Sequence, residues 1–456
     1  VGCSTSGRSK KCFYSTTVKD ISDLKPAYDV VIVGAGGHNG LISAAYLQKA
    51  GYSVCVLEQR NVIGGAAITE EIVPGFKFSR ASYVLSLLRP YIINDLKLKE
   101  HGLKFYMREP YCSYTPIKEK LWSDFPAKSL FLSNNPTLNT AEISKFSKKD
   151  AHAYEKYEEK MSKFVKAVVY LLDNRPPNLS NAPGDGSIMK KLKSLIPLWK
   201  AAKEIRGDIP EFHEMMTASA SKILNRWFKS EPLKATLATD ALIGTMSGPH
   251  TLGTGYVLLH HIMGGIDGKP GAWAYAEGGM GAVSSAIGSS AAQLGASIFT
   301  GQEIQEIVYS SEQGGKSRAT GVVTKNGKEV RANLAVFSNA TPEVTFRKLT
   351  NVQHAPTIFW RGVYEIVAVS RLPNFAADPN PTPIVFTIHT NEPMFAFFSL
   401  IHTLFTVQRI LGGSNFKEKI YSTAQCPSTS YWLRPMFTKS MLVPTNSSAR
   451  FVSMWK

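Results

Sequence analysis

The hydrophobic pattern near the amino end of the chain predicts a strand, a helix and a second strand in close succession. Tyr28 to Val33 is an apolar run interrupted only by Asp29, which is typical of a parallel strand buried on both faces. Ser53 to Leu57 is a second such run. Between them the apolar residues recur at helical spacing, and Gly51 ends the helix. The residues expected to face the sheet from this helix are Leu41, Ala44, Ala45 and Leu47.

The turn between the first strand and the helix is rich in glycine, with Gly34, Gly36, Gly37 and Gly40. Glycine lets the chain turn sharply and brings bare backbone close to a pyrophosphate, which then lies at the positive N-terminus of the helix. Glu58 follows the second strand, where a carboxylate can accept hydrogen bonds from both ribose hydroxyls. A glycine-rich turn alone is common in loops, and a carboxylate at a strand end is often only solvated. The agreement of all these elements favours a dinucleotide site.

The spacing of these glycines departs from the usual fingerprint by one position. Counted from Gly34 and Gly36, the third glycine should be residue 39, but Asn39 stands there and Gly40 follows. One residue is therefore inserted in the turn. The turn could bulge and still bind, or bind more weakly, and we favour the bulge.

The middle of the chain predicts helices. Lys148 to Leu172 has apolar residues at helical spacing, and Ser187 to Arg206 is a second candidate that Pro197 should kink or break. The proline-rich stretch Asn174 to Gly186 is expected to form a loop between them. With 456 residues, of which 44% are hydrophobic, the chain is long enough for two or three domains.

Several segments beyond the first unit carry a family resemblance. The pair Gly64–Gly65 follows the acidic residue in the pattern E-x5-G-G, and a GF-x-F segment comes next. Glu277–Ile307 resembles a GGMG helix with its following strand, and Thr320–Pro342 resembles a hairpin with a returning strand, in which Asn326-Gly327 is typical of a two-residue turn. Together these segments resemble the FAD-binding half of the phytoene desaturase and amine oxidase group of flavoproteins, continuously from about Tyr28 to Leu349.

The resemblance implies an α/β fold with FAD as cofactor. An FAD-binding Rossmann-like domain, of the glutathione reductase or amine oxidase type, would carry an inserted and mainly helical cap domain for the substrate. The FAD-binding domain would be discontinuous, comprising residues 20–90 and 271–350, with the cap at 91–270. Residues 1–19 would be a targeting leader, and 351–456 a divergent C-terminal segment.

The resemblance also implies which residues contact the cofactor. Those expected to line the pyrophosphate are Gly34, Gly36, Gly37 and Gly40. Those expected to pass over the diphosphate are Gly64, Gly65 and Ala66. Glu58 would hold the adenosine ribose, and Ile304 would offer its backbone to the adenine.

For activity, the resemblance implies an oxidoreductase that transfers a hydride from an apolar or amine-type substrate to flavin. Such reactions need few acid–base residues because positioning over the flavin supplies much of the rate. The sequence identifies neither the substrate, nor the electron acceptor, nor the catalytic residues. Tyr256, His260 and His261 are candidates on the cap side, although packing is the simpler interpretation of each.

The cysteines and histidines do not form a recognisable reactive or metal-binding set. The cysteines, which contain no C-x-x-C pair to relay electrons to a flavin, are Cys3, Cys12, Cys55, Cys112 and Cys426. Their scatter favours a reducing compartment, and Cys55 is expected to be a small buried strand residue. No metal-ligand spacing and no G-x-S-x-G nucleophile motif is present.

The C-terminal part of the sequence keeps an alternative function open. Flavoproteins of this group close the site with a glycine-rich strand and helix, whereas after Gly362 this sequence has only Gly412 and Gly413. Without that closing segment, the chain could be a non-catalytic relative that binds a partner or a lipid, as Rab GDP-dissociation inhibitors do with the same architecture.

The chain is strongly basic, with a formal charge of +17. The basic residues are spread out and not interleaved with aromatics, so we expect no nucleic-acid partner. Met189 to Arg206 combines apolar residues with lysines and could contact an anionic membrane surface, although a cap helix with a solvated basic face is the simpler interpretation. Met394 to Val407 is too short to span a bilayer and is expected to be a buried helix or strand pair.

The amino-terminal segment predicts a mitochondrial protein, most simply one of the matrix. It is basic and rich in Ser and Thr, and contains no acidic residue before Asp20. This is the composition of a mitochondrial transit peptide, and the segment lacks the apolar core of a secretory signal. An ordinary unstructured tail is the alternative.

Overall fold

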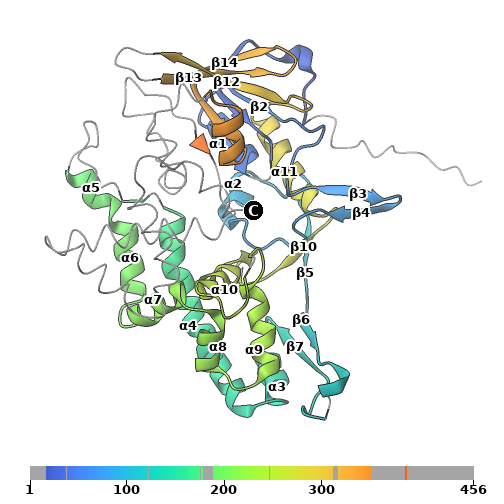
Figure 1. Ribbon diagram of the computed structural model, residues 1–456, viewed down its shortest axis with the longest axis vertical. Helices are drawn as coiled ribbons and strands as arrows, with labels where there is room; N and C mark the ends of the chain where they lie inside the picture. Colours follow the sequence, from blue (N-terminus) through green and yellow to red (C-terminus); the bar gives the residue numbers. More distant parts are fainter. Residues whose placement is uncertain are drawn as a thin grey trace, which may run out of the picture.

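The computed structural model describes residues 17–36, 39–121, 123–174, 176–177, 188–245, 247–311, 317–351 and 386–387. It shows a mixed β-sheet that carries α1 (Asn39–Lys49) and α11 (Met280–Gln293), and a larger, mainly helical part (Figure 1). The α/β fold with a helical part that the sequence predicts is therefore confirmed.

The main sheet is built around a parallel core. Its seven strands are β1 (Ala27–Val33), β2 (Val54–Leu57), β11 (Ser297–Phe299), β12 (Ile304–Ser311), β13 (Ser317–Thr324), β14 (Glu329–Ser338) and β15 (Phe386–Thr387). They are ordered β11-β2-β1-β14-β13-β12, and β15 pairs with β14. The strands β11, β2, β1 and β14 are parallel, whereas β13 is antiparallel to both of its neighbours. Strands from distant parts of the sequence therefore lie side by side at two places, where β11 pairs with β2 and where β14 pairs with β1.

The apolar run of β1 reflects burial on both faces of this sheet. Val30 and Ile32 are 0% exposed and belong to the cluster that includes Leu41 of α1. Val31 and Val33 belong to a second cluster, to which β12, β13 and β14 contribute. Because side chains alternate along a strand, a strand covered on both faces must be apolar throughout. Each fully buried valine or isoleucine stabilises the fold by roughly 1.5–3 kcal/mol relative to an exposed one.

The hairpin between β13 and β14 forms at the predicted place but with a different turn. Thr324 N donates to Lys328 O at 2.9 Å, so three residues form the loop. Gly327, the last of them, has φ +76°, while Asn326 is not among the residues with positive φ. A two-residue type I′ turn needs positive φ at both central positions, so that prediction was wrong; the geometry is that of a three-residue loop ending in a left-handed glycine.

The mainly helical part contains most of the remaining elements. Its helices are α3 (Pro136–Ser144), α4 (Lys148–Leu172), α5 (Ile188–Ser194), α6 (Ile196–Glu204), α7 (Ile209–Thr217), α8 (Ala220–Trp227), α9 (Glu231–Ala238) and α10 (Thr254–Ile262). The predicted bounds of α4 are confirmed. Ser147 caps α4 by accepting from Asp150 N at 3.1 Å, and buried side chains such as Tyr157 and Phe164 form its inner face. The predicted break near Pro197 is confirmed, because α5 ends at Ser194 and α6 begins at Ile196.

Short elements connect the two parts or extend from them. They are η2 (Ile21–Asp23), β3 (Thr69–Val73), β4 (Phe76–Ser79), α2 (Pro90–Asp95), β5 (Phe105–Met107), β6 (Tyr111–Pro116), η3 (Glu119–Leu121), β7 (Ser129–Ser133), η4 (Thr239–Ala241), β8 (Gly265–Ile266), β9 (Lys269–Pro270), β10 (Ala274–Ala276) and η5 (Val344–Lys348). The antiparallel pair β5–β10 lies between the sheet and α10 in Figure 1.

Several predictions fall on residues outside the described ranges. These include Gly37, most of the predicted leader, most of the loop at 174–186, the run Met394–Val407 and nearly all of the C-terminal segment. The end of the predicted leader is described, and it contacts the sheet: Lys19 N donates to Ile298 O at 2.9 Å. Within the described residues, no helix has the length and apolar character needed to cross a bilayer.

Candidate functional site

The glycine turn after β1 brings backbone atoms into close contact. Gly34 has φ +93°, a left-handed conformation that favours glycine, and its N–H donates to Leu57 O at 2.8 Å. A Cβ at Gly40 would lie 2.4 Å from Gly34 O, so α1 can approach the turn only because residue 40 has no side chain. Gly40 thus makes the close helix–strand contact that the third glycine of the fingerprint makes, despite the extra residue before it.

The second glycine pair lies directly against this turn. Gly64 N donates to Ala35 O at 2.9 Å, and Gly64 forms a parallel bridge with Gly36. A Cβ at Gly36 would lie 3.7 Å from Gly65 Cα. Ala66 follows at an exposed position. The two glycine segments therefore present adjoining bare backbone, as expected of a chain that folds back over a diphosphate.

Glu58 connects the same turn to β2. Its side chain is buried, with 5% of the residue exposed, and its Oε2 accepts from Ala35 N at 2.8 Å while its Oε1 accepts from Arg60 N at 3.0 Å. Burial raises the pKa of the Glu58 carboxyl, and the hydrogen bonds from Arg60 N and Ala35 N oppose that rise. A carboxylate has about four acceptor positions, more than the hydrogen bonds from Ala35 N and Arg60 N occupy. Glu58 is therefore not the exposed strand-end carboxylate that the sequence left as an alternative.

The backbone near Ile304 reaches the same edge of the sheet. Ile304 is 7% exposed and begins β12, opposite Thr324 of β13. Two residues earlier, Gln302 N donates to Glu58 O at 2.8 Å. The described residues among those predicted to contact the cofactor thus gather where β1 and β2 end, which is where open α/β sheets bind ligands.

Asn339 is a site residue that sequence reasoning missed. It follows β14, its backbone N donates to Val33 O at 2.8 Å, and its Nδ2 donates to Gly36 O. The side chain therefore fixes the glycine turn from the neighbouring parallel strand. The only signal in the sequence was a polar residue directly after a predicted returning strand, but its place beside β1 depends on the order of the strands.

An ion-pair network around Glu70 is a second feature that the sequence did not reveal. Arg60 contacts one oxygen of Glu70, and Arg80 contacts the other at 2.5 Å. The hydrogen bond from Arg80 is the largest influence holding the pKa of Glu70 below its usual value. Since Arg60 also donates from its backbone to Glu58, the network connects the Glu58 carboxylate to β3.

The cap-side candidates Tyr256, His260 and His261 all lie on α10. His261 Nδ1 lies 2.9 Å from Val257 O, one helical turn earlier, and the His261 ring is 6.3 Å from that of Trp273. The buried Nδ1 of His260 has no hydrogen-bond partner among the described residues. Burial, with the neighbouring His261, lowers the pKa of His260 to about 4. These contacts are those of packed residues, and they assign no catalytic role.

The described cysteines do not form a redox pair. Cys55 is 0% exposed within β2, and burial raises the pKa of its thiol. Cys112 is half-buried, and its Sγ lies 3.4 Å from Leu132 O. Among the described residues, no group of three or more His, Cys, Asp or Glu side chains is arranged to hold a metal ion.

Comparisons with known proteins agree with this geometry. Residues 32–93 match the family of NAD(P)-binding Rossmann-like domains. The chain is 50% identical over 370 residues to pyridine nucleotide-disulfide oxidoreductase domain-containing protein 2 of Rattus norvegicus, which covers 78% of this chain and 62% of that protein. The chain thus spans less than two thirds of the length of this relative.

Two further similarities are more limited. One subunit of the limonene dehydrogenase of Castellaniella defragrans is 48% identical over 77 residues, covering 16% of this chain and 13% of that protein. A double mutant of putrescine oxidase, among solved structures, gives a TM-score of 0.46 at 16% identity over 74% of this chain and 63% of that one.

The family model thus confirms the Rossmann-like unit that the sequence predicts near the amino end. The chain is a close homologue of pyridine nucleotide-disulfide oxidoreductase domain-containing protein 2, with a nucleotide-binding Rossmann-like region near its amino end.

Proposed function

We propose that this chain binds FAD at the carboxyl ends of β1 and β2 and acts as an oxidoreductase. The observation that carries the proposal is the meeting of two glycine segments and one buried carboxylate. Gly36 and Gly64 are bridged, and Glu58 bonds to Ala35 within the same turn. Bare backbone of this kind admits a pyrophosphate, while the carboxylate accepts from the adjoining ribose.

The carboxylate also restricts which dinucleotide fits. An ionised Glu58 accepts hydrogen bonds from a ribose 2′-hydroxyl but repels a 2′-phosphate, so NADP is disfavoured. The glycine pair Gly64–Gly65 against the first turn favours FAD over NAD, because it adds a second backbone segment over the diphosphate.

In this proposal the protein orients the cofactor and excludes water from it. Backbone N–H groups of the glycine turn and the N-terminal end of α1 would hold the diphosphate, and Glu58 would hold the ribose. Asn339 would keep the turn in place through Gly36. FAD, when bound, supplies the hydride acceptor, and the substrate would be an apolar or amine-type molecule. The similarity to a limonene dehydrogenase polypeptide supports the apolar class.

The site of action proposed from the leader composition is the mitochondrial matrix. Import of a tagged full-length chain into isolated mitochondria, followed by protease protection, tests this part separately. A chain that stays protease-sensitive would contradict it.

Purified protein tests the cofactor proposal. We expect absorbance bands at about 370 and 450 nm, the usual flavin bands, and loss of FAD on dilution from a Glu58→Ala variant. Without the ribose hydrogen bonds, its affinity for FAD should fall roughly tenfold or more. Glu306→Ala, at an exposed carboxylate on β12, is the matched control and should retain FAD.

A colourless protein that takes up no added FAD would overturn the proposal. That result would leave the non-catalytic, partner-binding or lipid-binding function as the remaining candidate. Binding of FAD that is equally tight in wild type and Glu58→Ala would instead contradict the assigned ribose contact.

A further inference from the structure

The helices α5 and α6 expose apolar side chains that the protein core does not use. The exposed fractions are 77% for Ile188, 61% for Met189, 55% for Leu192, 47% for Ile196 and 62% for Trp199. α5 has no buried residue at all. A contiguous group of large apolar side chains that is exposed to solvent often marks an interaction surface.

The opposite side of α6 packs against the core, which leaves Ile196 and Trp199 exposed to solvent. Ala201 and Ile205, at its end, are buried in the core of the helical part, which α4 shares. Ile196 and Trp199 lie three residues apart on α6 and so follow one side of that helix, and Leu192 is exposed on α5 just before it. The basic helix is therefore not simply a solvated face, because its outward side carries a tryptophan and branched aliphatics.

Lysines surround this apolar side. Between Ile188 and Lys203 the sequence contains five lysines and no acidic residue. Among the described residues, no carboxylate lies within ion-pair distance of Lys190, Lys193, Lys200 or Lys203. Apolar side chains together with uncompensated lysines match the chemistry of an anionic lipid surface, which offers hydrocarbon below a layer of phosphates.

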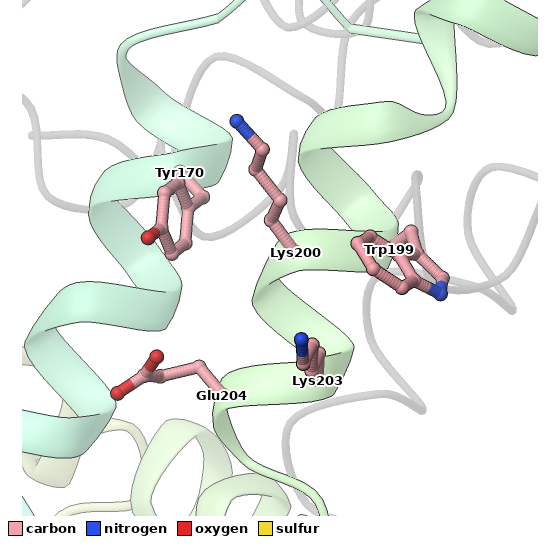
Figure 2. A pocket seen from close by; sticks show the side chains of 5 residues that line it. All are labelled: Tyr170, Trp199, Lys200, Lys203 and Glu204. Carbon is pink, nitrogen blue, oxygen red and sulfur yellow. The ribbon is translucent and has the colours of Figure 1, made fainter.

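A pocket between α4 and α6 lies beside these residues and is large enough for one lipid head group. It has a volume of about 380 Å³ and is lined by Tyr170, Trp199, Lys200, Lys203 and Glu204. Figure 2 shows Tyr170 on one helix and the other four side chains on the next. Lys200 Nζ lies 5.9 Å from the Tyr170 ring centre, and Lys203 Nζ lies 5.4 Å from that of Trp199. Each ammonium is thus held beside a ring at the rim of the apolar side.

We infer that the α5–α6 surface, defined as Ile188 to Lys203, docks on the surface of an anionic lipid bilayer. Leu192, Ile196 and Trp199 enter the boundary between head groups and acyl chains, and Lys200 and Lys203 contact lipid phosphates. The inference is independent of FAD binding and gives the chain a peripheral membrane position.

Co-sedimentation with vesicles tests the inference on the full chain. The vesicles are phosphatidylcholine alone, or phosphatidylcholine with about a third cardiolipin or phosphatidylserine. We expect binding to both anionic mixtures, little binding to neutral vesicles, and release at high salt. Binding to neutral vesicles as tight as to anionic ones would overturn the inference, as would no binding to any vesicle.

Two double variants locate the surface. Lys200→Glu with Lys203→Glu should weaken binding roughly tenfold or more, since each lysine near an anionic surface attracts it. The control with equal charge change is Lys77→Glu with Lys328→Glu, at two exposed lysines on β4 and the β13–β14 hairpin. If the control pair weakens binding as much as the first pair, general charge and not this surface is responsible, and the inference fails.

The apolar contribution has its own matched pair. Leu192→Ser with Trp199→Ser should lower binding, whereas Ile72→Ser with Phe76→Ser, at residues 59% and 63% exposed on β3 and β4, should not. All four residues are exposed, so neither pair should unfold the protein. A Leu192/Trp199 variant that binds vesicles normally but loses a dimer in sedimentation would show that a second copy covers this surface, and would overturn the inference.

Discussion

At the scale of single residues, the candidate site depends on places where no side chain fits. Gly40 contacts the carbonyl of Gly34, and Gly36 lies near both Gly65 and the Asn339 amide. These contacts join the helix, the first turn and the second turn through backbone alone. The turn geometry that a pyrophosphate needs is thus set by the lack of side-chain atoms at a few positions.

Gly40→Ala tests this dependence. The added Cβ would lie 2.4 Å from a backbone oxygen, which cannot move as a flexible side chain would. We expect a loss of about 1–3 kcal/mol in the free energy of unfolding, measured by denaturant titration, together with weaker FAD binding. Gly248→Ala is the control, since nothing lies within 4 Å of a Cβ there. Equal stability of both variants would show that the close contact has no energetic role.

His260 should make stability depend on pH. Burial lowers its pKa from 6.5 to about 4, so the unfolded state binds the proton more readily than the folded state. The stability contribution is present above pH 6.5 and is lost as the pH falls towards 4, by up to about 3 kcal/mol. Between pH 6.5 and pH 4, His260→Phe should lose less free energy of unfolding than the wild type does. Thermal or denaturant unfolding at several pH values measures this difference.

The matched control for this prediction is His152→Phe on the exposed side of α4. It should follow the wild-type pH dependence. If His260→Phe and the wild type instead show parallel curves between pH 7 and pH 4, burial of His260 does not perturb its protonation.

At the scale of elements, local periodicity was enough to predict several helices and strands. The bounds of α4 and the break between α5 and α6 were predictable because apolar spacing and Pro197 act within a few turns of the chain. The three-residue hairpin loop was not, because the turn type depends on how β13 and β14 pair. The role of Asn339 was also hidden, since only the strand order places it beside Gly36.

Asp150 shows a similar non-local effect at the start of α4. It is 1% exposed, and its carboxylate accepts from Lys229 N at 2.9 Å and from Ser230 N at 2.6 Å. Asp150→Ala would leave two backbone donors without their partner, so we expect a loss of about 2–4 kcal/mol in the free energy of unfolding. Asp150→Asn, which keeps one acceptor oxygen, should lose less. The neighbouring exposed Lys149→Ala is the control, and an equally large loss there would contradict the explanation.

At the scale of the whole molecule, the sheet and the helical part meet through close contacts. Leu85 bridges to Ala274 of β10, and β10 pairs with β5. A Cβ at Gly264, just after α10, would lie 1.8 Å from Ser86 Oγ, which itself lies 3.1 Å from Ala272 O. Contacts this tight should couple unfolding of the two parts.

The FAD binding proposed above provides a test of that coupling. At a free FAD concentration of about 100 times its Kd, the protein should be stabilised by roughly 2.7 kcal/mol. The far-ultraviolet circular dichroism signal comes mainly from helices, most of which lie away from the proposed site. We expect this helical signal to melt at higher temperature with FAD, and not to shift in Glu58→Ala. If added FAD raises the temperature of flavin release but not the melting temperature of the helical signal, the two parts unfold independently.

The contact between Asn339 and Gly36 has a consequence for synthesis on the ribosome. The two residues are separated by 303 positions, and β1 pairs with β14 only once that distant strand exists. At translation rates of 5–20 residues per second, the gap amounts to roughly 15–60 s. During that interval the nascent chain carries an apolar strand with one free edge, the kind of edge that invites wrong pairing. Newly made β1 should therefore be a preferred binding segment for chaperones that recognise extended hydrophobic peptides.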